Sequence, residues 1–282
     1  MVSVLILAKN EEHDLPGCLK SVSWCDDVHV LDSSSTDQTA AVAAAAGAHV
    51  RERVFDNYAA QRNSGLHETT FKHDWVLLLD ADERIPEELA TEMRRRIPSA
   101  NHETSAFRIR RRDFWMGTWL RHAQISPFYI RLVRPGKVHY EREVNEVLIV
   151  DGTIEELEEP FDHYPFSKGV GHWFDKHNRY STMEADQVLL LNSNSKSGEP
   201  ISLRKALFHN DFNVRRFHQK ALFYRMPFRP FMKFCYMLFA RRAFLDGRAG
   251  IAYSFLQSIY EYMIVLKTRE RKSWLEDSRE GR

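Results

Sequence analysis

Short, almost wholly apolar runs alternate with mixed segments over the first ninety residues. The runs at 2–8 and 75–79 are too short for a buried helix and too apolar for a half-exposed strand. They therefore predict strands in the middle of a parallel sheet. Further strands are predicted at 28–31 and 48–53. Strands that alternate with helices in this way indicate half of a doubly wound α/β domain, whose functional edge lies at the carboxyl ends of its strands.

Capping signals mark the predicted helices between these strands. Asp14, two residues before Pro16, is typical of a helix start with proline in the first turn. Residues 35–38 have the spacing of a capping box and are expected to open an alanine-rich helix that Gly47 ends. Further helices are predicted at 61–69 and 86–96.

The pattern changes after residue 107. Residues 108–110 and 129–133 alternate polar and apolar side chains, as solvated antiparallel strands do. A turn at Pro135 and Gly136 is expected to connect the second of these to a strand at 144–150. A helix is predicted at 171–191 and a linker at 192–200, which is rich in Asn and Ser. We therefore expect one domain at 1–195 and an extension at 196–282.

The net charge of +1 conceals a division between these two parts. Residues 1–200 contain 23 Lys and Arg against 32 Asp and Glu, whereas residues 201–282 contain 17 against 7. Ten aromatic residues between Phe208 and Phe239 are interleaved with arginines and lysines. Such a basic, aromatic segment predicts docking at an anionic membrane surface. The alternative is a helical hairpin packed on the first domain, and nucleic acid is disfavoured because no nucleic-acid-binding module is present.

The first residues and the cysteines bear on the cellular compartment. Residues 1–7 have no basic lead and no cleavage site of small residues, so they predict a first strand and not a secretory signal. Three cysteines form neither a disulfide framework nor a metal-finger pattern. The uncharged run at 250–260 in the extension is too short to span a bilayer. A cytoplasmic location is therefore expected.

Acidic residues stand at the ends of two of the predicted strands. Asp80 and Asp82 follow a buried strand two residues apart, so their carboxylates are expected to leave the sheet on one side and share a hard cation such as Mg²⁺ or Mn²⁺. The unfilled positions of that cation suit water and the oxygens of a diphosphate. Asp32 ends another strand and suits the hydroxyls of a ribose. The structural alternatives are helix-capping acids at Asp80 and Asp82 and a turn aspartate at Asp32.

Common nucleotide and hydrolase motifs are missing. The sequence has no Gly-x-Gly-x-x-Gly, no phosphate-binding P-loop and no Gly-x-Ser-x-Gly. Dinucleotide oxidoreductases, P-loop kinases and serine hydrolases therefore lose their usual support.

Four segments of the first ninety residues resemble the signature blocks of family 2 glycosyltransferases, which have the GT-A fold. They are Ser-Val-Leu-Ile-Leu-Ala-Lys-Asn-Glu-Glu at 3–12, Leu-Asp-Ser-Ser-Ser-Thr-Asp-Gln-Thr at 31–39, Gln-Arg-Asn-Ser-Gly-Leu at 61–66 and Leu-Asp-Ala-Asp-Glu at 79–83. The segments at 57–63, 131–132, 145–146 and 178–180 are similar to the bacterial branch that includes the lipopolysaccharide core β-1,4-glucosyltransferases. The resemblance covers about residues 2–190 and is looser beyond 200. It implies a Rossmann-like mixed α/β sheet with a nucleotide-binding half at 1–100, an acceptor half at 101–195 and a C-terminal helical extension.

The resemblance also implies roles for individual residues. Ala8, Asn10 and Glu12 match the loop that holds the nucleobase, and Asp32 matches the ribose contact. Arg62 matches the basic residue near the diphosphate. Asp80 and Asp82 match the metal motif, with Asp82 as the direct ligand, and His163 falls where related enzymes place a histidine near the diphosphate or the metal. A structural role is the alternative for His163.

The catalytic base is implied less directly. Related enzymes have a His-Glu pair after the Arg-Leu strand, whereas this chain has Asn145 and Glu146. Glu146 is the first choice for the base, and Glu143 and Asp113 are reserves. The segment 114–117 could line a sugar pocket by stacking or belong to the core. Trp119, His122 and Arg131 are candidates to line the acceptor side.

Together these features predict a metal-dependent inverting hexosyltransferase. The expected donor is UDP-glucose, and the expected acceptor is a saccharide on lipopolysaccharide or another envelope glycan. The enzyme is expected to be peripheral on the cytoplasmic face of the inner membrane. Two alternatives stay open: a polyprenyl-phosphate glycosyltransferase and a nucleotide-sugar-binding scaffold without turnover.

Overall fold

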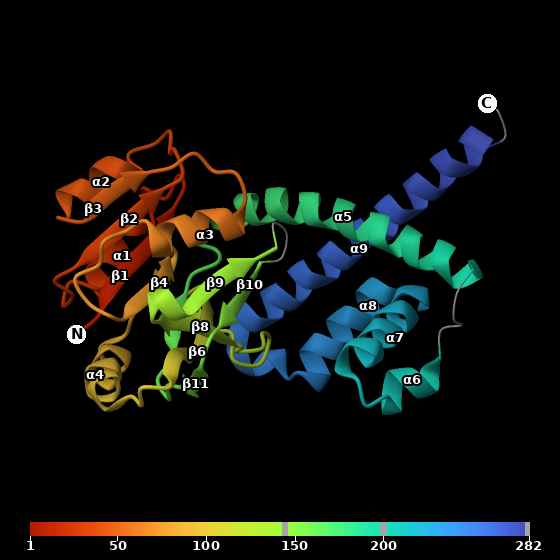
Figure 1. Ribbon diagram of the computed structural model, residues 1–282. Coiled ribbons are helices and arrows are strands. Elements are labelled where there is room, and N and C mark those ends of the chain that lie inside the picture. Colours follow the sequence, from red (N-terminus) through yellow and green to blue (C-terminus); the bar gives the residue numbers. More distant parts are fainter. Residues whose placement is uncertain (143–145, 198–201, 280–282) are drawn as a thin grey trace. The chain divides into compact units, whose positions relative to one another are not determined.

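The computed structural model describes residues 1–142, 146–197 and 202–279. The chain forms two compact units (Figure 1). The sheet unit contains Met1–Trp119 and Gln124–Ser167, and the helical unit contains Leu120–Ala123 and Lys168–Arg282. The helix at 169–197 groups by its contacts with the helices that follow it, whereas the sequence pattern predicts a first domain that extends to residue 195.

Within its described residues, the sheet unit contains a ten-stranded mixed sheet. The main order is β3 (His49–Glu52), β2 (Val28–Asp32), β1 (Ser3–Ala8), β4 (Val76–Asp80), β8 (Phe128–Val133), β6 (Thr104–Trp115), β12 (Phe161–His163) and β5 (Glu83–Arg84). β7 (Thr118–Trp119) and β11 (Thr153–Glu156) also pair with β6. β1 to β4 pair in parallel, and β8 runs antiparallel to both β4 and β6. The predicted parallel half is thus extended by an antiparallel half.

Both faces of the central strands are buried, which explains their uninterrupted apolar sequences. Alternate residues of β1 and β4, such as Ile6 and Leu79, face the cluster that includes α1 (Leu15–Ser21), α2 (Thr39–Ala45) and α4 (Glu87–Arg96). Leu5 and Leu78 face the opposite cluster with Leu66 of α3 (Tyr58–His67). Helices on both faces leave the strand ends as the place where polar side chains gather.

Two predicted helix starts need correction. The helix α2 begins at Thr39 and not at residues 35–38. The expected capping box fails because the hydroxyl of Ser35 binds the carboxylate of Asp32, while the carboxylate of Asp37 accepts from the backbone N–H of Thr39 at 3.0 Å. The helix α3 begins earlier than predicted, at Tyr58, because the Asn57 side chain caps it by accepting from the N–H of Ala60 at 2.8 Å.

The connection after β8 also differs from the prediction. Pro135–Lys137 forms a single 3₁₀ turn, as the Pro-Gly pair indicated, but it leads into the unpredicted strand β9 (Val138–Glu141). β9 pairs antiparallel with β10 (Val147–Val150), which is the described part of the strand predicted at 144–150. Residues 143–145 lie outside the described residues.

The helical unit is made of α5 (Gly169–Ser197), α6 (Leu203–Phe208), α7 (Phe212–Arg225), α8 (Arg229–Cys235) and α9 (Gly247–Arg279), with short helical turns at Tyr236–Ala240 and Ala243–Asp246. The helices α5 and α9 contact each other and cross at an angle (Figure 1). The predicted linker is wrong over 192–197, where α5 continues to Ser197. Adding a residue to an existing helix needs no new nucleus, so Asn and Ser at the end of a long helix are tolerated.

The predicted fold class is confirmed: a mixed α/β sheet is followed by a helical C-terminal region. None of the helices in the described part of the chain is long and apolar enough to span a bilayer.

Candidate active site

Three central strands bring predicted site residues to one edge of the sheet. Ala8 at the end of β1 is the register partner of Asp32 at the end of β2, and Leu7 is the partner of Asp80 at the end of β4. All three strands are parallel, so their carboxyl ends meet at this edge. Ala8, Asp32 and Asp80 are therefore neighbours although Ala8 and Asp80 are 72 positions apart in the sequence.

The loops after β1 and β2 are joined by hydrogen bonds. Asn10, which has φ of +56°, donates its backbone N–H to Ser35 Oγ at 2.8 Å and accepts from the N–H of Thr36 at 2.8 Å. Glu12 accepts from the N–H of Gln38 at 3.0 Å. The structure thus places Asn10 and Glu12 together at the rim of the edge that holds Asp32.

Asp32 is almost fully buried and binds the loop that follows it. Its Oδ2 accepts from the N–H of Ser35 at 3.0 Å, and its Oδ1 accepts from the Ser35 hydroxyl. Each carboxylate oxygen has two lone pairs, so Asp32 retains capacity for a further donor such as a ribose hydroxyl. In the present geometry its role is to shape the loop at 33–35.

Two arginines hold the carboxylate of Asp80. Arg131 of β8 donates to Asp80 Oδ2 at 2.9 Å, and Arg62 of α3 donates to Asp80 Oδ1 at 3.3 Å. Arg131 also binds Glu83, whose second carboxylate oxygen accepts from the backbone N–H of Asp80 at 3.0 Å. Both oxygens of Asp80 are therefore engaged by protein donors.

The charges of this cluster alter its pKa values in opposite directions. Burial alone would raise the pKa of Asp80, but the guanidinium groups of Arg131 and Arg62 outweigh it and hold that pKa well below its usual range. Burial raises the pKa of Glu83 to about 7, although Arg131 acts against it. Asp80 is therefore ionised at neutral pH.

Asp82 projects toward a histidine and not toward the arginines. Its Oδ2 lies 3.3 Å from His163 Nε2, and the other ring nitrogen of His163 lies 2.5 Å from Asp113 Oδ1. Asp113 is buried and also forms an ion pair with Arg111 at 3.0 Å. Burial alone would lower the pKa of His163, but the carboxylates of Asp113 and Asp82 outweigh it and raise that pKa to about 9.

The pair of Asp82 and His163 fits one divalent cation as a partial site. Two neighbouring ligands of an octahedral ion at roughly 2.1 Å are roughly 3 Å apart, close to the 3.3 Å between Asp82 Oδ2 and His163 Nε2. The imidazole can coordinate once Nε2 has lost its proton, and Asp113 fixes its orientation through Nδ1. No group of three or more His, Cys, Asp or Glu side chains suited to a metal occurs among the described residues. The remaining ligands would have to come from water or substrate.

Glu146 lies next to the same arginine that contacts Asp80. Its Oε1 is 3.4 Å from Arg62 Nε, and both side chains are largely shielded from solvent. The Nη1 of Arg62 is buried and has no hydrogen-bond partner among the residues that the structure describes. An oxygen-rich anion such as a diphosphate would supply the acceptor that this nitrogen lacks. The reserve base Glu143 lies outside the described residues, as does Asn145.

The structure also places the other residues that the sequence singled out near the site. Arg131, expected on the acceptor side, is buried against Asp80 and Glu83. His122 belongs to the helical unit, where its Nδ1 lies 2.6 Å from Asp246. The carboxylate of Asp113, a reserve candidate for the base, is engaged by His163 and Arg111. Glu83 was not predicted as a site residue. Its position directly after the Asp-Ala-Asp segment was a signal that its carboxyl group lies beside the same charged groups as Asp80.

The aromatic segment at 114–117 lines a cavity of about 280 Å³ with Arg84, Tyr164 and Phe166. Phe114 stacks on Tyr164 at 5.5 Å between ring centroids. Asp82, Asp113 and His163 are not among the described residues that line this cavity.

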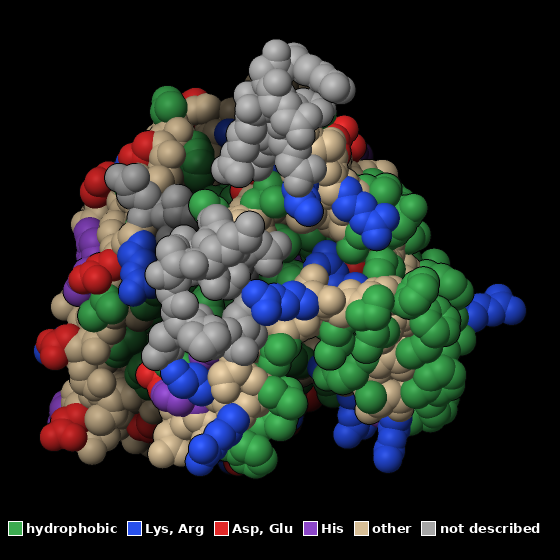
Figure 2. All heavy atoms as spheres, turned by 90° about the vertical axis from the view of Figure 1, so that its right-hand side faces the viewer, with side chains coloured by type: hydrophobic (Ala, Val, Ile, Leu, Met, Phe, Trp, Pro, Cys, Tyr) green, Lys and Arg blue, Asp and Glu red, His purple; other side chains and the backbone are tan. Residues whose placement is uncertain are grey.

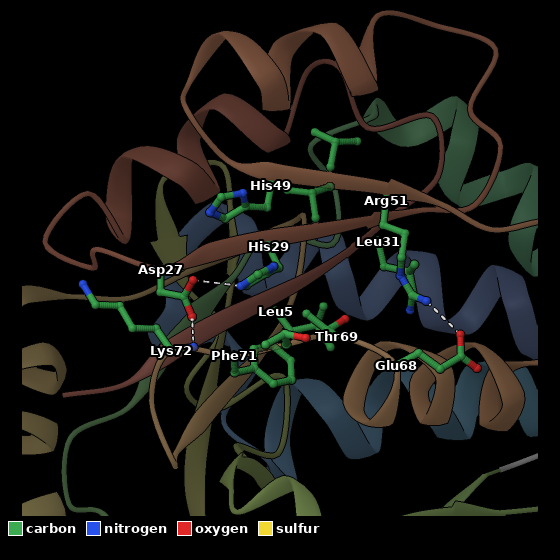
Figure 3. A pocket seen from close by; sticks show the side chains of 13 residues that line it. Leu5, Asp27, His29, Leu31, His49, Arg51, Glu68, Thr69, Phe71 and Lys72 are labelled. Carbon is green, nitrogen blue, oxygen red and sulfur yellow. Dashed lines mark hydrogen bonds and ion pairs between the residues drawn. The ribbon is translucent and has the colours of Figure 1, made fainter.

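A separate cavity of about 430 Å³ contains none of the predicted site residues. Figure 3 shows His29 and His49 side by side in it, with Asp27 bonded to His29 and to the backbone of Lys72. Asp27, His29 and His49 stand at the amino ends of β2 and β3, whereas Asp32 and Asp80 stand at carboxyl ends. The two sets of polar residues thus lie at opposite ends of the strands.

Comparison with known proteins provides independent information. The family model described as Glycosyl transferase family 2 matches residues 3–155. The lipopolysaccharide core biosynthesis glycosyltransferase LpsC of Rhizobium meliloti is 24% identical over 278 residues, 96% of this chain and 92% of that protein. An uncharacterized glycosyltransferase of Rickettsia bellii is 36% identical over 36% of this chain and 34% of its own length.

A solved structure is also similar over part of the chain. It is glucosyl-3-phosphoglycerate synthase from Mycobacterium tuberculosis in complex with Mn²⁺, UDP and glucosyl-3-phosphoglycerate, with 25% identity and a TM-score of 0.33. The match covers 42% of this chain and 44% of that one.

The buried pairing of Arg131 with Glu83 predicts a stability effect. Arg131→Met should lower the free energy of unfolding by about 3 kcal/mol, because it leaves a buried carboxyl group without its partner. The double variant Arg131→Met with Glu83→Gln should recover about half of that loss. Urea unfolding followed by circular dichroism measures both values. A loss under about 1 kcal/mol, or no recovery in the double variant, would contradict the assigned pairing.

Proposed function

The chain belongs to glycosyl transferase family 2 and is a glycosyltransferase, and from this premise we propose that it is a metal-dependent inverting hexosyltransferase. The proposed donor is UDP-glucose, and the proposed acceptor is a saccharide on lipopolysaccharide or another envelope glycan. The resemblance to lipopolysaccharide core β-1,4-glucosyltransferases supports this donor. The similarity to LpsC along nearly the whole chain supports this acceptor class.

One observation carries the chemical part of the proposal. Arg62 lies 3.3 Å from Asp80 and 3.4 Å from Glu146, so it joins the end of β4 to the start of β10. The candidate for binding the leaving group and the candidate base are therefore neighbours. An inverting displacement needs the base and the leaving-group contact on opposite sides of the anomeric carbon, so the donor sugar and the acceptor would have to enter between Glu146 and Arg62 and separate this ion pair.

In the proposed reaction Glu146 accepts the proton of an acceptor hydroxyl. The hydroxyl oxygen then forms a bond to the anomeric carbon while the bond from that carbon to the diphosphate breaks on the opposite face. The buried Nη1 of Arg62 stabilises the negative charge that develops on the departing diphosphate. Arg131 keeps Asp80 ionised and in place during this step.

Asp82 and His163 are the proposed protein ligands of a divalent cation. When bound, Mg²⁺ or Mn²⁺ would supply further neutralisation of the diphosphate charge. Asp113 holds the ring of His163 so that Nε2 faces Asp82. Ala8, Asn10 and Glu12 are proposed to hold the nucleobase and Asp32 the ribose, as the family resemblance implies.

The surface of the helical unit supports association with a membrane. Side chains of Phe208, Phe228, Phe231 and Phe239 are between 65% and 82% exposed. Figure 2 shows hydrophobic side chains gathered on this face, with Lys and Arg side chains beside them. Exposed rings favour the interfacial region of a bilayer, and basic side chains favour anionic headgroups. We therefore include peripheral binding to the cytoplasmic face of the inner membrane in the proposal.

The cation site predicts the effect of one substitution. Asp82→Ala should lower turnover with Mn²⁺ by about a thousandfold, because the ion loses its carboxylate ligand at the reacting diphosphate. Release of UDP from UDP-glucose, measured with and without Mn²⁺, tests this. The exposed Asp74→Ala serves as the control and should keep full activity. Unchanged turnover in Asp82→Ala would remove the metal assignment.

The base assignment predicts a change in rate and not in donor binding. Glu146→Gln should lower kcat by a factor of about 10² to 10⁴ and leave the Kd for UDP nearly unchanged, because the amide cannot accept the proton. The matched control is Glu141→Gln, at an exposed position on β9. A rate for Glu146→Gln close to that of the unchanged enzyme would assign the base elsewhere.

The arginines of the helical unit predict how strongly the enzyme binds anionic vesicles. Replacing four arginines of the helical unit by glutamate should weaken binding to vesicles rich in phosphatidylglycerol by at least about a hundredfold, since each basic group near the surface contributes roughly 1 kcal/mol. The four are Arg215, Arg216, Arg241 and Arg242. Co-sedimentation at low and high salt measures the effect.

A control with the same change in net charge keeps this test specific. Four basic residues of the sheet unit are replaced by glutamate instead, namely Arg94, Arg95, Arg110 and Lys137, all of which are exposed. This variant should retain vesicle binding close to that of the unchanged enzyme. Equal losses in both variants would show that net charge and not the helical face governs the association.

A further inference from the structure

The helical unit contains a cavity of about 560 Å³ that the proposed reaction does not use. Its walls come from α5, from the segment that connects α7 to α8, and from the helices α8 and α9. Most of its lining is apolar, and the residues that form this part include Val188, Met226, Phe228, Phe231, Tyr262 and Val265. Two arginines, Arg229 and Arg269, also line it, together with Tyr224 of α7 and Thr268 of α9. The volume lies within the range of pockets that bind small molecules.

Arg229 is the unusual member of this lining because its side chain is only 4% exposed. Its Nε lies 3.1 Å from Glu261 Oε2, and its Nη1 donates to the carbonyl of Tyr224 at 3.4 Å. Its Nη2 is buried and has no hydrogen-bond partner among the described residues. A buried guanidinium with an unused donor is costly, and an anionic ligand in the cavity would supply the missing acceptor.

The charges around the cavity favour an anion. Glu261 is buried, and burial raises its pKa although Arg229, Lys233 and Lys220 act against this. The other acid that acts on it is Glu184. Arg229 and Arg269 are the charged side chains among the described residues that line the cavity, and none of those lining residues is Asp or Glu.

The mouth of the cavity is exposed and aromatic. Phe228 is 82% exposed and Phe231 is 67% exposed. Phe228 has φ of +52°, a left-handed conformation that is strained for a bulky residue, and it precedes the first turn of α8, where Arg229 stands. The chain thus holds a ring outward and a guanidinium inward at consecutive positions.

We propose that this cavity binds one molecule of an anionic phospholipid, with the phosphate on Arg229 and Arg269 and an acyl chain along the apolar wall. The proposal rests on the membrane association described above and gives it a specific contact. A guanidinium binds phosphate through two parallel N–H bonds, and Arg229 has the donor for one of them. Inorganic phosphate shares the charge of this ligand but leaves the apolar wall uncovered, so it should bind far more weakly.

Titration of the full-length protein with short-chain lipids in the absence of vesicles tests the proposal. Dihexanoylphosphatidylglycerol, kept below its micellar concentration, should bind with a stoichiometry of one in isothermal titration calorimetry. Dihexanoylphosphatidylcholine should bind at least about tenfold more weakly, because its headgroup has no net charge. Inorganic phosphate at the same concentration should neither bind measurably nor compete. Absence of saturable binding by the anionic lipid, or equally strong binding of inorganic phosphate, would overturn the proposal.

Variants at the exposed part of the cavity locate the binding. Phe228→Ser and Arg269→Gln should each weaken lipid binding about tenfold. Their matched controls are Phe208→Ser, a similarly exposed ring of α6, and Arg248→Gln, an exposed arginine of α9, and both should bind as the unchanged protein does. Equal effects in the cavity variants and the controls would overturn the assigned site.

A third variant addresses the buried donor. Arg229→Lys keeps a positive charge beside Glu261 but removes Nη2. Its melting temperature should therefore stay close to that of the unchanged protein, while its affinity for the anionic lipid falls. Unchanged affinity in a folded Arg229→Lys variant would contradict the role of this donor. Release of UDP from UDP-glucose is measured on the same samples. Because the titration contains no sugar nucleotide, a failure of the proposed reaction and a failure of the lipid site remain distinguishable.

Discussion

The pairing of Asp80 with Arg62 and Arg131 is the interaction on which the candidate site depends. Carboxylates at the end of a buried strand are costly unless cations neutralise them. Arg131 supplies one cation from the antiparallel half of the sheet, and Arg62 supplies the other from α3. Because both oxygens of Asp80 are held in this way, Asp82 is the acid of the pair that turns toward His163. The two acids of the Asp-Ala-Asp segment thus have different tasks.

This division links the fold to the proposed chemistry. The parallel half of the sheet brings Ala8, Asp32 and Asp80 to one edge, where a sugar nucleotide is proposed to bind. The antiparallel half adds Arg131, and β12 adds His163. Glu146 stands just before β10 and reaches Arg62. The helical unit contributes a different kind of surface, basic and aromatic, which supports a role at a membrane.

Much of the sheet unit could be predicted from sequence because its strands carry strong local signals. Uninterrupted apolar runs mark β1 and β4, and family-like segments marked the residues from Ala8 to Asp82. Contacts between distant segments could not be predicted: no local pattern shows that Arg131 is buried beside Glu83, or that Asp113 binds His163. The short strand β9 was missed because four residues with mixed polarity carry little periodicity. The end of α5 was missed because the prediction followed the Asn- and Ser-rich composition of this segment and not the ease with which an existing helix is extended.

The central claim is that Asp82 and His163 hold a divalent cation that meets the diphosphate of a sugar nucleotide, while Asp80 stays with its arginines. A crystal structure of the enzyme with UDP and Mn²⁺ measures this directly, because anomalous scattering locates manganese. We expect an anomalous peak within coordination distance of the Asp82 carboxylate and of a diphosphate oxygen, with Arg62 against the same diphosphate. A manganese ion bound elsewhere, or UDP bound away from the carboxyl ends of β1, β2 and β4, would contradict it.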